Sequence, residues 1–145
     1  MSGDPQAEPV WVVAVGAIVI DRGERVLLVR RARPPSAGVW TLPGGRVEGA
    51  ESLEAAVLRE VREETALDAR VVCPLGVVPV AREGFAYVIH EFLLAPLDGR
   101  AALAPGDDAA DARWARRDEL EGLGVWPDVV ELVERGLAET RARVS

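Results

Sequence analysis

The chain has 145 residues, 49% of them hydrophobic and 28% charged, and these proportions are typical of one globular domain with a sizeable core. Its net charge is −7 and no long basic run is present, which excludes non-specific binding of nucleic acid or of anionic membranes. All 17 basic residues are arginine, and there is one cysteine, Cys73, and one histidine, His90, so a catalytic lysine, an internal disulfide and a structural zinc cluster are excluded.

The first part of the chain predicts a tail, two strands and a loop. Residues 1–9 are interpreted as a flexible tail that lacks the basic segment of a signal peptide. The β-branched run from Val10 to Ile20 predicts a strand and is too short to cross a bilayer as a helix, so we expect a cytoplasmic protein. A turn at "DRGER" and a second strand at "VLLVRR" predict a hairpin with that strand. "ARPPSAG" is a loop, because consecutive prolines fit neither a helix nor a central strand.

The rest of the chain predicts helices and further strands. "VWTLPGG" is a short extended segment, and residues 52–65 form the first helix. Strands are expected at "ARVVCPLGVVPV", "FAYVIHEFLLAPL" and "DARWA", and helical segments at "RRDELEGL" and "PDVVELVERGLAETRAR". Without an internal repeat or a linker, residues 10–145 are expected to form a single mixed α/β domain, with a largely hairpin-built sheet and helices packed on it.

Three glutamates, Glu60, Glu63 and Glu64, stand near the C-terminal end of the first predicted helix. At about 100° per residue they lie on the same side as Leu53, so we expect them to face the sheet and a cleft. A solvated face held by ion pairs is the usual alternative. It fits poorly, because the only basic–acidic i,i+4 pair here is Arg59 with Glu63. Buried carboxylates need a positive partner, and in a chain without lysine a hard divalent cation such as Mg²⁺ is the natural candidate.

The segment from Gly45 to Leu67, "GRVEGAESLEAAVLREVREETAL", contains this helix within a longer motif. It resembles the Nudix box, a loop–helix–loop signature, at every defining position except one, where Ala66 replaces the family's usual glycine. The segments "VGAIVI", "RVLLVRRA" and "DARW" extend the resemblance over residues 10–135. The resemblance implies a Nudix fold, a mixed β-sheet in an α/β/α sandwich, and hydrolysis of a nucleoside diphosphate linked to another moiety.

The resemblance also implies roles for residues of the motif. Glu60, Glu63 and Glu64 match the family's metal-binding glutamates, and the backbone carbonyl of Gly45 often joins them, with Mg²⁺ or Mn²⁺ as the metal. Glu63 or Glu60 is expected to be the catalytic base that takes a proton from the attacking water.

Three further residues of the motif are expected to support its geometry. Arg59 and Glu51 match positions that brace the loop and the helix, and Arg59 is also counted among the catalytic candidates. At the C-terminal end of the helix a glycine takes a positive φ cheaply, whereas alanine costs about 1 kcal/mol there. Ala66 is therefore expected either to adopt a positive φ at this cost or to lie in a turn with a different backbone conformation.

An acidic run later in the chain, "GDDAAD", offers a further ligand or base. Asp108 is the preferred candidate for that role, and Asp107 is a candidate for substrate binding, while Asp111 completes the run. Alternatively, these residues form an ordinary solvated acidic loop.

Candidates for substrate contacts flank the Pro-Pro loop. Arg31 and Arg33 are candidates for contacts with phosphate or ribose, and Trp40 for stacking on a base. Alternatively, the arginines form a solvated rim and Trp40 belongs to the core. Phe85 and Tyr87 alternate on one face of a predicted strand and are interpreted as packing residues.

The wider resemblance favours ADP-ribose pyrophosphatase-type members, which cleave ADP-ribose to AMP and ribose 5-phosphate. Against this, Arg82 stands where one ADP-ribose group has a proline. The main alternative is a MutT-type (deoxy)nucleoside triphosphate pyrophosphohydrolase, and a third is a non-catalytic nucleotide-sensing module, which typically loses the glutamates that this chain keeps. The expected partner is a small nucleotide rather than nucleic acid or a membrane, and a homodimer is left open.

Overall fold

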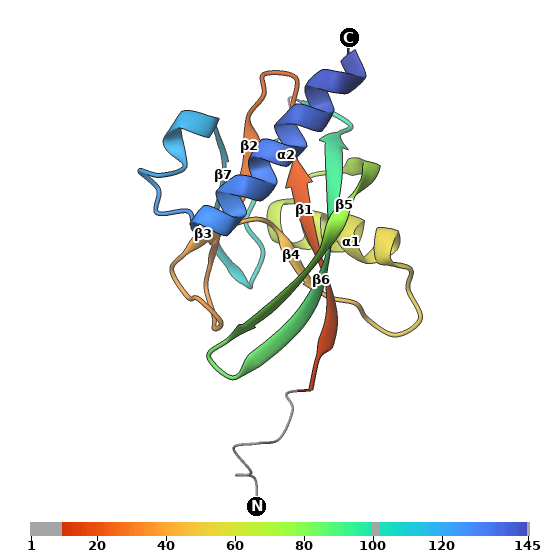
Figure 1. Ribbon diagram of the computed structural model, residues 1–145, viewed down its shortest axis with the longest axis vertical. Helices are drawn as coiled ribbons and strands as arrows, with labels where there is room; N and C mark the ends of the chain where they lie inside the picture. The colour runs from red at the N-terminus through yellow and green to blue at the C-terminus, as the bar shows by residue number, and fades with distance from the viewer. Residues whose placement is uncertain (1–9, 100–101, 145) are drawn as a thin grey trace, which may run out of the picture.

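The computed structural model describes residues 10–99 and 102–144, so the predicted tail at residues 1–9 lies outside the described residues. In chain order the strands are β1 (Val12–Val19), β2 (Val26–Arg31), β3 (Trp40–Thr41), β4 (Gly44–Arg46), β5 (Ala69–Arg82), β6 (Phe85–Pro96) and β7 (Ala109–Ala115). The helices are α1 (Leu53–Thr65), the short 3₁₀ helix η1 (Arg117–Glu119) and α2 (Pro127–Val144) (Figure 1). All the strands expected from the sequence are present.

The strands form two sheets, with orders β4-β1-β6-β5 and β3-β2-β7. In the first sheet β1 runs parallel to β6 and antiparallel to β4, so the sheet is mixed. β5 and β6 form a long hairpin whose tip projects away from the body of the molecule (Figure 1). β1 is therefore the strand that joins this hairpin to the motif segment at β4.

The predicted hairpin between β1 and β2 is wrong. β2 pairs with β3 and β7, and within the described residues its only backbone pairing with the β1 segment is an isolated bridge from Ile20 to Val26. The reason is that residues 14–19 of β1 are all buried, so this strand is covered on both faces and needs a neighbour on each edge. β4 and β6 occupy both edges, and the sheet is less hairpin-built than expected.

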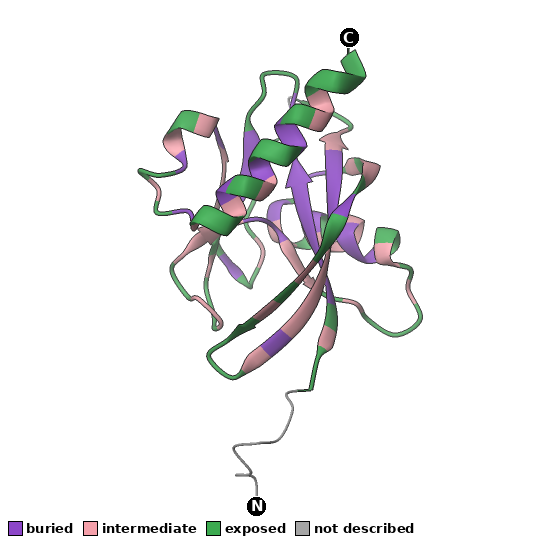
Figure 2. Cartoon of the chain, in the orientation of Figure 1, coloured by how far each residue is buried: buried purple, intermediate pink, exposed green. Residues whose placement is uncertain are grey.

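The two α-helices cover opposite faces of the first sheet. α2 packs over a cluster that includes Ile18 and Leu93, whereas α1 packs over a cluster that includes Ala17 and Leu94, as expected for strand residues that alternate between faces. Figure 2 shows that buried residues concentrate where the helices cover the strands, while the outer half of the β5–β6 hairpin is mostly intermediate or exposed. This arrangement confirms the α/β/α prediction.

The helix expected at "RRDELEGL" is wrong in extent, because only η1 forms there. Gly122 follows it and Gly124 adopts a φ of +76°, a conformation that ends regular helices. Within the described residues, no helix is long and apolar enough to cross a membrane.

Candidate active site

Helix α1 begins and ends as its sequence dictates. The Ser52 side chain accepts a hydrogen bond from the Ala55 N–H at 3.1 Å and caps the start. At the other end Ala66 adopts a φ of +63°, and its N–H donates to the Arg62 carbonyl at 2.9 Å. The turn therefore keeps the left-handed geometry that glycine would take, with an alanine in place.

The acidic loop packs against the C-terminal end of α1. The Ala104 N–H donates to the Thr65 carbonyl at 2.9 Å, and the Gly106 N–H donates to the Glu64 carbonyl at 3.2 Å. A Cβ at Gly106 would lie 2.0 Å from the Glu63 carbonyl oxygen, so only glycine permits this approach. These contacts satisfy the last helix carbonyls and bring the "GDDAAD" run beside the glutamates.

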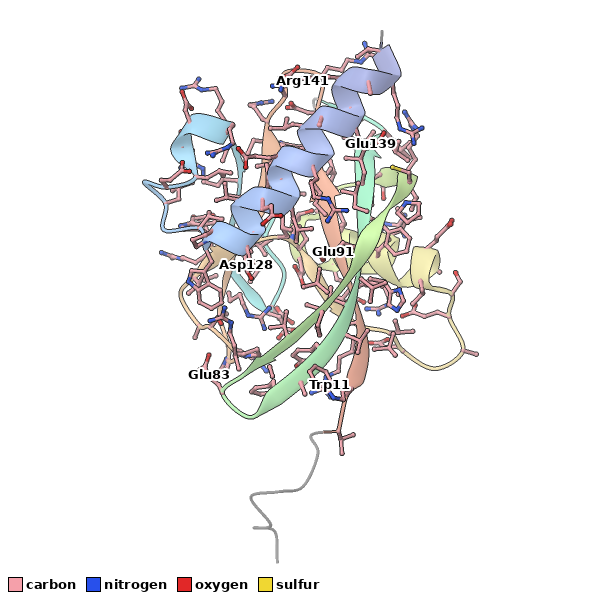
Figure 3. The ribbon with its side chains drawn as sticks, in the orientation of Figure 1. Trp11, Glu83, Glu91, Asp128, Glu139 and Arg141 are labelled. Atoms are coloured by element: carbon pink, nitrogen blue, oxygen red, sulfur yellow. The ribbon has the colours of Figure 1, made fainter. Side chains whose placement is uncertain are left out.

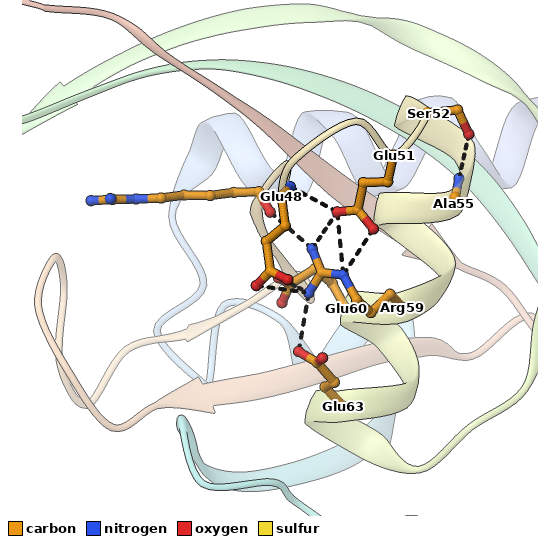
Figure 4. A network of polar contacts seen from close by, with 8 residues as sticks. Glu48, Glu51, Ser52, Ala55, Arg59, Glu60 and Glu63 are labelled. Atoms are coloured by element: carbon orange, nitrogen blue, oxygen red, sulfur yellow. Dashed lines mark hydrogen bonds and ion pairs between the residues drawn. The ribbon is translucent and has the colours of Figure 1, made fainter.

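Arg59 is the centre of a network of carboxylates (Figure 4). Its guanidinium lies 2.6 Å from Glu51, 2.9 Å from Glu60, 3.1 Å from Glu63 and 3.6 Å from Glu48, and it also donates to the Arg46 carbonyl. These ion pairs raise the pKa of Arg59 above its usual value, chiefly through the bond to Glu51. Arg59 and Glu51 were expected to brace the loop and the helix, and their side chains pair here, whereas the ion pair of Arg59 with Glu48 was not expected. Arg59 ties the loop to the helix.

Glu60 and Glu64 form a close pair of half-buried carboxyl groups. Burial raises the pKa of Glu64 to about 8, with a further contribution from the negative charge of Glu60. Burial also raises the pKa of Glu60, although Arg59 opposes this effect. The two side chains hydrogen-bond each other, and the Gly44 N–H donates to Glu64 at 3.4 Å. Two carboxyl groups this close to each other disfavour the ionisation of both at once.

Glu63 differs from the other two glutamates. Its side chain is 58% exposed and turns toward Arg59, whereas the Glu60 side chain is 13% exposed. The expectation that all three carboxylates face the sheet and a cleft is therefore wrong for Glu63. It lies on the opposite flank of the helix face from Glu64, because three residues advance a helix by about 300° and four by about 400°.

The donor set fits a divalent cation, although its members are not assembled around one point. Within the described residues, no group of three or more histidine, cysteine, aspartate or glutamate side chains is placed to hold a metal ion. Arg59 explains this, since it draws Glu60 and Glu63 to itself. A Cβ at Gly45 would lie 2.5 Å from the Glu60 carboxyl group, so glycine leaves the space that this side chain needs. Carboxylate and carbonyl oxygens are the ligands that Mg²⁺ and Mn²⁺ prefer.

A cavity of about 600 Å³ opens beside the Glu60–Glu64 pair. Of the residues predicted from the sequence, seven line it: Arg31, Arg33, Trp40, Gly45, Glu60, Glu64 and Asp108. Five do not: Glu51, Arg59, Glu63, Ala66 and Asp107. The structure thus brings the helix glutamates, the Pro-Pro loop and the acidic loop to a single opening.

The arginines and the tryptophan on this wall have mixed environments. The positive charge of Arg31 lowers the pKa of Glu64, against the larger effect of burial. Arg33 pairs with Asp108 at 3.4 Å, and both side chains are largely exposed, so this pair contributes little to stability. Trp40 packs against the core and also lines the cavity, with the Arg30 guanidinium 5.8 Å from its ring centre. The core interpretation of Trp40 therefore applies, and its stacking on a base stays a prediction.

Several cavity residues escaped the sequence analysis. Phe85 and Tyr87, interpreted as packing residues, stack with ring centres 6.0 Å apart and line the cavity. Trp126 also lines it and carries the Arg82 guanidinium 3.8 Å from its ring centre. Glu91 lies at the cavity wall with 4% of its surface exposed. Its signal was available, because it is the only charged residue in the strand "FAYVIHEFLLAP".

Comparison with known proteins gives consistent findings. A family model for the NUDIX domain matches residues 10–135. The 8-oxo-dGDP phosphatase NUDT18 of Danio rerio is 33% identical over 129 residues, which are 88% of this chain and 38% of that protein. The ADP-ribose pyrophosphatase of Methanocaldococcus jannaschii is 40% identical over 113 residues, which are 77% of this chain and 65% of that protein. The chain thus spans less than two thirds of these curated relatives.

The solved structures give the same result for the fold. The MutT protein from Methanosarcina mazei Go1 superposes with a TM-score of 0.77 at 25% identity, covering 93% of this chain and 99% of that one.

Proposed function

Because the chain belongs to the Nudix family, we propose that it hydrolyses a nucleoside diphosphate linked to a second moiety, and that its substrate is ADP-ribose, cleaved to AMP and ribose 5-phosphate. The observation that carries the proposal is the Glu60–Glu64 carboxyl pair at the wall of a cavity of about 600 Å³. A cavity of this size suits a nucleotide.

Glu60 and Glu64, with the Gly45 carbonyl, are the residues proposed to hold Mg²⁺ or Mn²⁺. A pyrophosphate link resists attack because its negative oxygens repel the nucleophile, and a bound divalent cation supplies the missing positive charge and lowers the pKa of water. Glu63 completes the set once its ion pair with Arg59 opens. Arg31, on the same wall, is the proposed partner of a phosphate oxygen.

The proton of the attacking water needs an acceptor in the same opening. Glu63 and Glu60 are the candidates on α1, and Asp108 is the candidate on the facing loop. Glu60 and Asp108 line the cavity, while Glu63 is open to solvent and can pass a proton outward. Each candidate is replaced in turn, glutamate by glutamine and aspartate by asparagine, and kcat is measured as a function of pH. The base is the residue whose replacement removes the acidic limb of the plot of kcat against pH.

Two substrates are supported by named relatives. ADP-ribose is supported by the M. jannaschii relative, which is named for that activity. A MutT-type (d)NTP pyrophosphohydrolase that removes oxidised nucleotides is the second candidate. The MutT structure supports the MutT type, and the D. rerio relative, named an 8-oxo-dGDP phosphatase, supports an oxidised nucleotide as the substrate.

A substrate panel with product identification tests the proposal. The purified chain with Mg²⁺ is given ADP-ribose, 8-oxo-dGTP, 8-oxo-dGDP or dGTP, and the products are identified by mass spectrometry. We expect AMP and ribose 5-phosphate, with kcat/KM for ADP-ribose at least about 10-fold above the others. Higher kcat/KM with an oxidised nucleotide would establish the second candidate instead. No turnover of any substrate would refute the enzymatic proposal.

The cytoplasmic location, the lack of nucleic-acid or membrane partners and the homodimer remain predictions. Size-exclusion chromatography with light scattering tests the homodimer directly.

A further inference from the structure

Glu91 occupies the centre of β6, with its carboxyl group inside the protein (Figure 3). Only 4% of its surface is exposed, and it lies on the wall of the cavity. Its strand neighbours are Gly16 on β1 and Gly76 on β5. Both positions directly beside this carboxyl-bearing residue therefore lack a side chain.

Gly16 makes room for the carboxyl group itself. A Cβ at Gly16 would lie 1.8 Å from Glu91 Oε1 and 2.8 Å from its carboxyl carbon. Any other residue at position 16 would thus displace the carboxyl group. The Glu91 carboxyl group therefore fills the space that a side chain at position 16 would take.

No direct partner neutralises Glu91 within the described residues. Burial raises its pKa to about 7, and the opposing effect is the more distant positive charge of Arg135. The Arg135 guanidinium donates to the Leu75 carbonyl instead. A buried, unpaired carboxylate is costly, and the neutral acid costs less. The neutral acid still presents one O–H donor and one C=O acceptor to the cavity.

The rest of this wall suits a flat ring. Tyr87 and Ile89 precede Glu91 on the same face of β6, and Trp126 lines the same cavity. A base that lies flat against Tyr87 and Ile89 has its edge directed at Glu91, because the Glu91 carboxyl group lies at the buried end of this row of side chains.

We propose that Glu91 is the specificity residue for the base, and that its protonated carboxyl group binds adenine by donating to a ring nitrogen and accepting from the exocyclic amino group. The assignment rests on the proposed hydrolysis of ADP-ribose. Glutamine makes the same paired contact with adenine in other settings, and a protonated glutamate has the same donor–acceptor layout. The guanine edge presents the opposite order at the same positions, an N–H donor at the ring nitrogen and the O6 acceptor beside it, so the proton that pairs with adenine lies on the wrong carboxyl oxygen for guanine.

Two substitutions at position 91 separate this role from packing. Glu91→Gln keeps one donor and one acceptor, so kcat/KM for ADP-ribose should stay within about 3-fold of the unsubstituted chain. Glu91→Leu keeps the volume and removes both, so kcat/KM should fall about 10- to 100-fold, mainly through a higher KM. The preference for ADP-ribose over GDP-ribose should be lost in Glu91→Leu and kept in Glu91→Gln. Glu131→Gln, an exposed glutamate on α2, is the matched control.

Either substitution can overturn the assignment. An unchanged preference in Glu91→Leu, or a loss of more than about 10-fold with ADP-ribose in Glu91→Gln, would show that Glu91 does not read adenine in this way. If Glu91→Leu does not fold, as judged by circular dichroism, the Glu91→Gln result decides.

Binding of the monophosphates keeps the test independent of catalysis. If the unsubstituted chain hydrolyses neither ADP-ribose nor GDP-ribose, the proposed function fails, and calorimetric titration with AMP and GMP still tests Glu91. Tighter binding of AMP than of GMP, abolished in Glu91→Leu, supports the role, and equal affinities for AMP and GMP refute it.

Discussion

The C-terminal half of α1 and the centre of β6 each place a carboxyl group on the same cavity wall, half-buried at Glu64 and buried at Glu91, with opposite surroundings. Glu64 has Glu60 against it, and its pKa is raised to about 8. Glu91 stands between two glycines, and burial raises its pKa to about 7. Crowded carboxyl groups gain from a divalent cation that binds several oxygens at once, whereas a solitary buried one gains from a proton. The same cost of burial therefore predicts a metal ligand in one place and a hydrogen-bonding acid in the other.

The largest expected effect is on stability as a function of pH. The pKa values of Glu64 and Glu91 are raised above the ordinary value of 4.5, so the folded chain binds their protons more tightly than the unfolded chain. Their stabilising contribution is complete below about pH 4.5 and is lost as pH rises through about 7 and about 8. Urea unfolding without metal should show a decrease of several kcal/mol over this range.

Magnesium should divide this pH effect between the two regions. Saturating Mg²⁺ should remove the pH dependence of the unfolding free energy that is due to Glu64 and leave the pH dependence due to Glu91. Glu91→Gln should remove the pH dependence due to Glu91 and leave that due to Glu64. If Mg²⁺ leaves the pH dependence unchanged, the distinction between the two carboxyl groups is wrong.

Activity should separate the two carboxyl groups by about two orders of magnitude. Glu64→Gln removes a proposed metal ligand and should lower kcat/KM by at least about 100-fold, more than the loss of an outer-shell partner. Glu91→Gln should change it by less than about 3-fold, and Glu54→Gln, exposed on the first turn of α1, is the control. Comparable losses in both variants would mean that the sites have similar roles.

Gly16→Ala should destabilise the chain through Glu91. The added Cβ would lie 1.8 Å from the carboxyl oxygen, and overpacking of this kind costs about 1–3 kcal/mol. In a Glu91→Ala background the same substitution should cost less than about 0.5 kcal/mol, because the clashing group is gone. Urea unfolding of the unsubstituted chain, the two single variants and the double variant gives the coupling free energy between the two positions. Equal costs of Gly16→Ala in both backgrounds would show that glycine is needed at position 16 for the backbone and not for Glu91.

The smallest expected effect concerns the end of α1. Ala66 holds a φ of +63°, so Ala66→Gly should stabilise the chain by about 1 kcal/mol. Ala55→Gly, at an exposed position in the first turn of the same helix, should destabilise it by up to a similar amount. A loss of stability in Ala66→Gly would show that the left-handed turn is not strained.

The sequence predicted the local features of the fold and missed those that depend on partners far along the chain. The limits of α1 follow from residues within one turn, and the predicted range of residues 52–65 differs from the observed helix by one residue at its start. The partners of β1 were not, because its apolar run is compatible with several neighbours and only the whole sheet selects β4 and β6.

The candidate site shows the same division. The motif supplied the glutamates and the bracing role of Arg59 and Glu51, but helix spacing alone placed Glu63 inward, and the ion pair of Arg59 with Glu48 was not foreseen. Glu91 stood out as the only charged residue of an apolar strand, but the sequence could not show the space around it, because its glycine neighbours lie 75 and 15 residues away along the chain.

Binding of Mn²⁺ to the unsubstituted chain and to Glu64→Gln, measured by isothermal titration calorimetry with Glu54→Gln as the control, tests the central claim most directly. We predict that the unsubstituted chain and the control bind Mn²⁺ with the same affinity and that Glu64→Gln binds it at least about 10-fold more weakly. Equal affinity in all three proteins, or no binding to the unsubstituted chain, would contradict the assignment of the Glu60–Glu64 pair as the metal site.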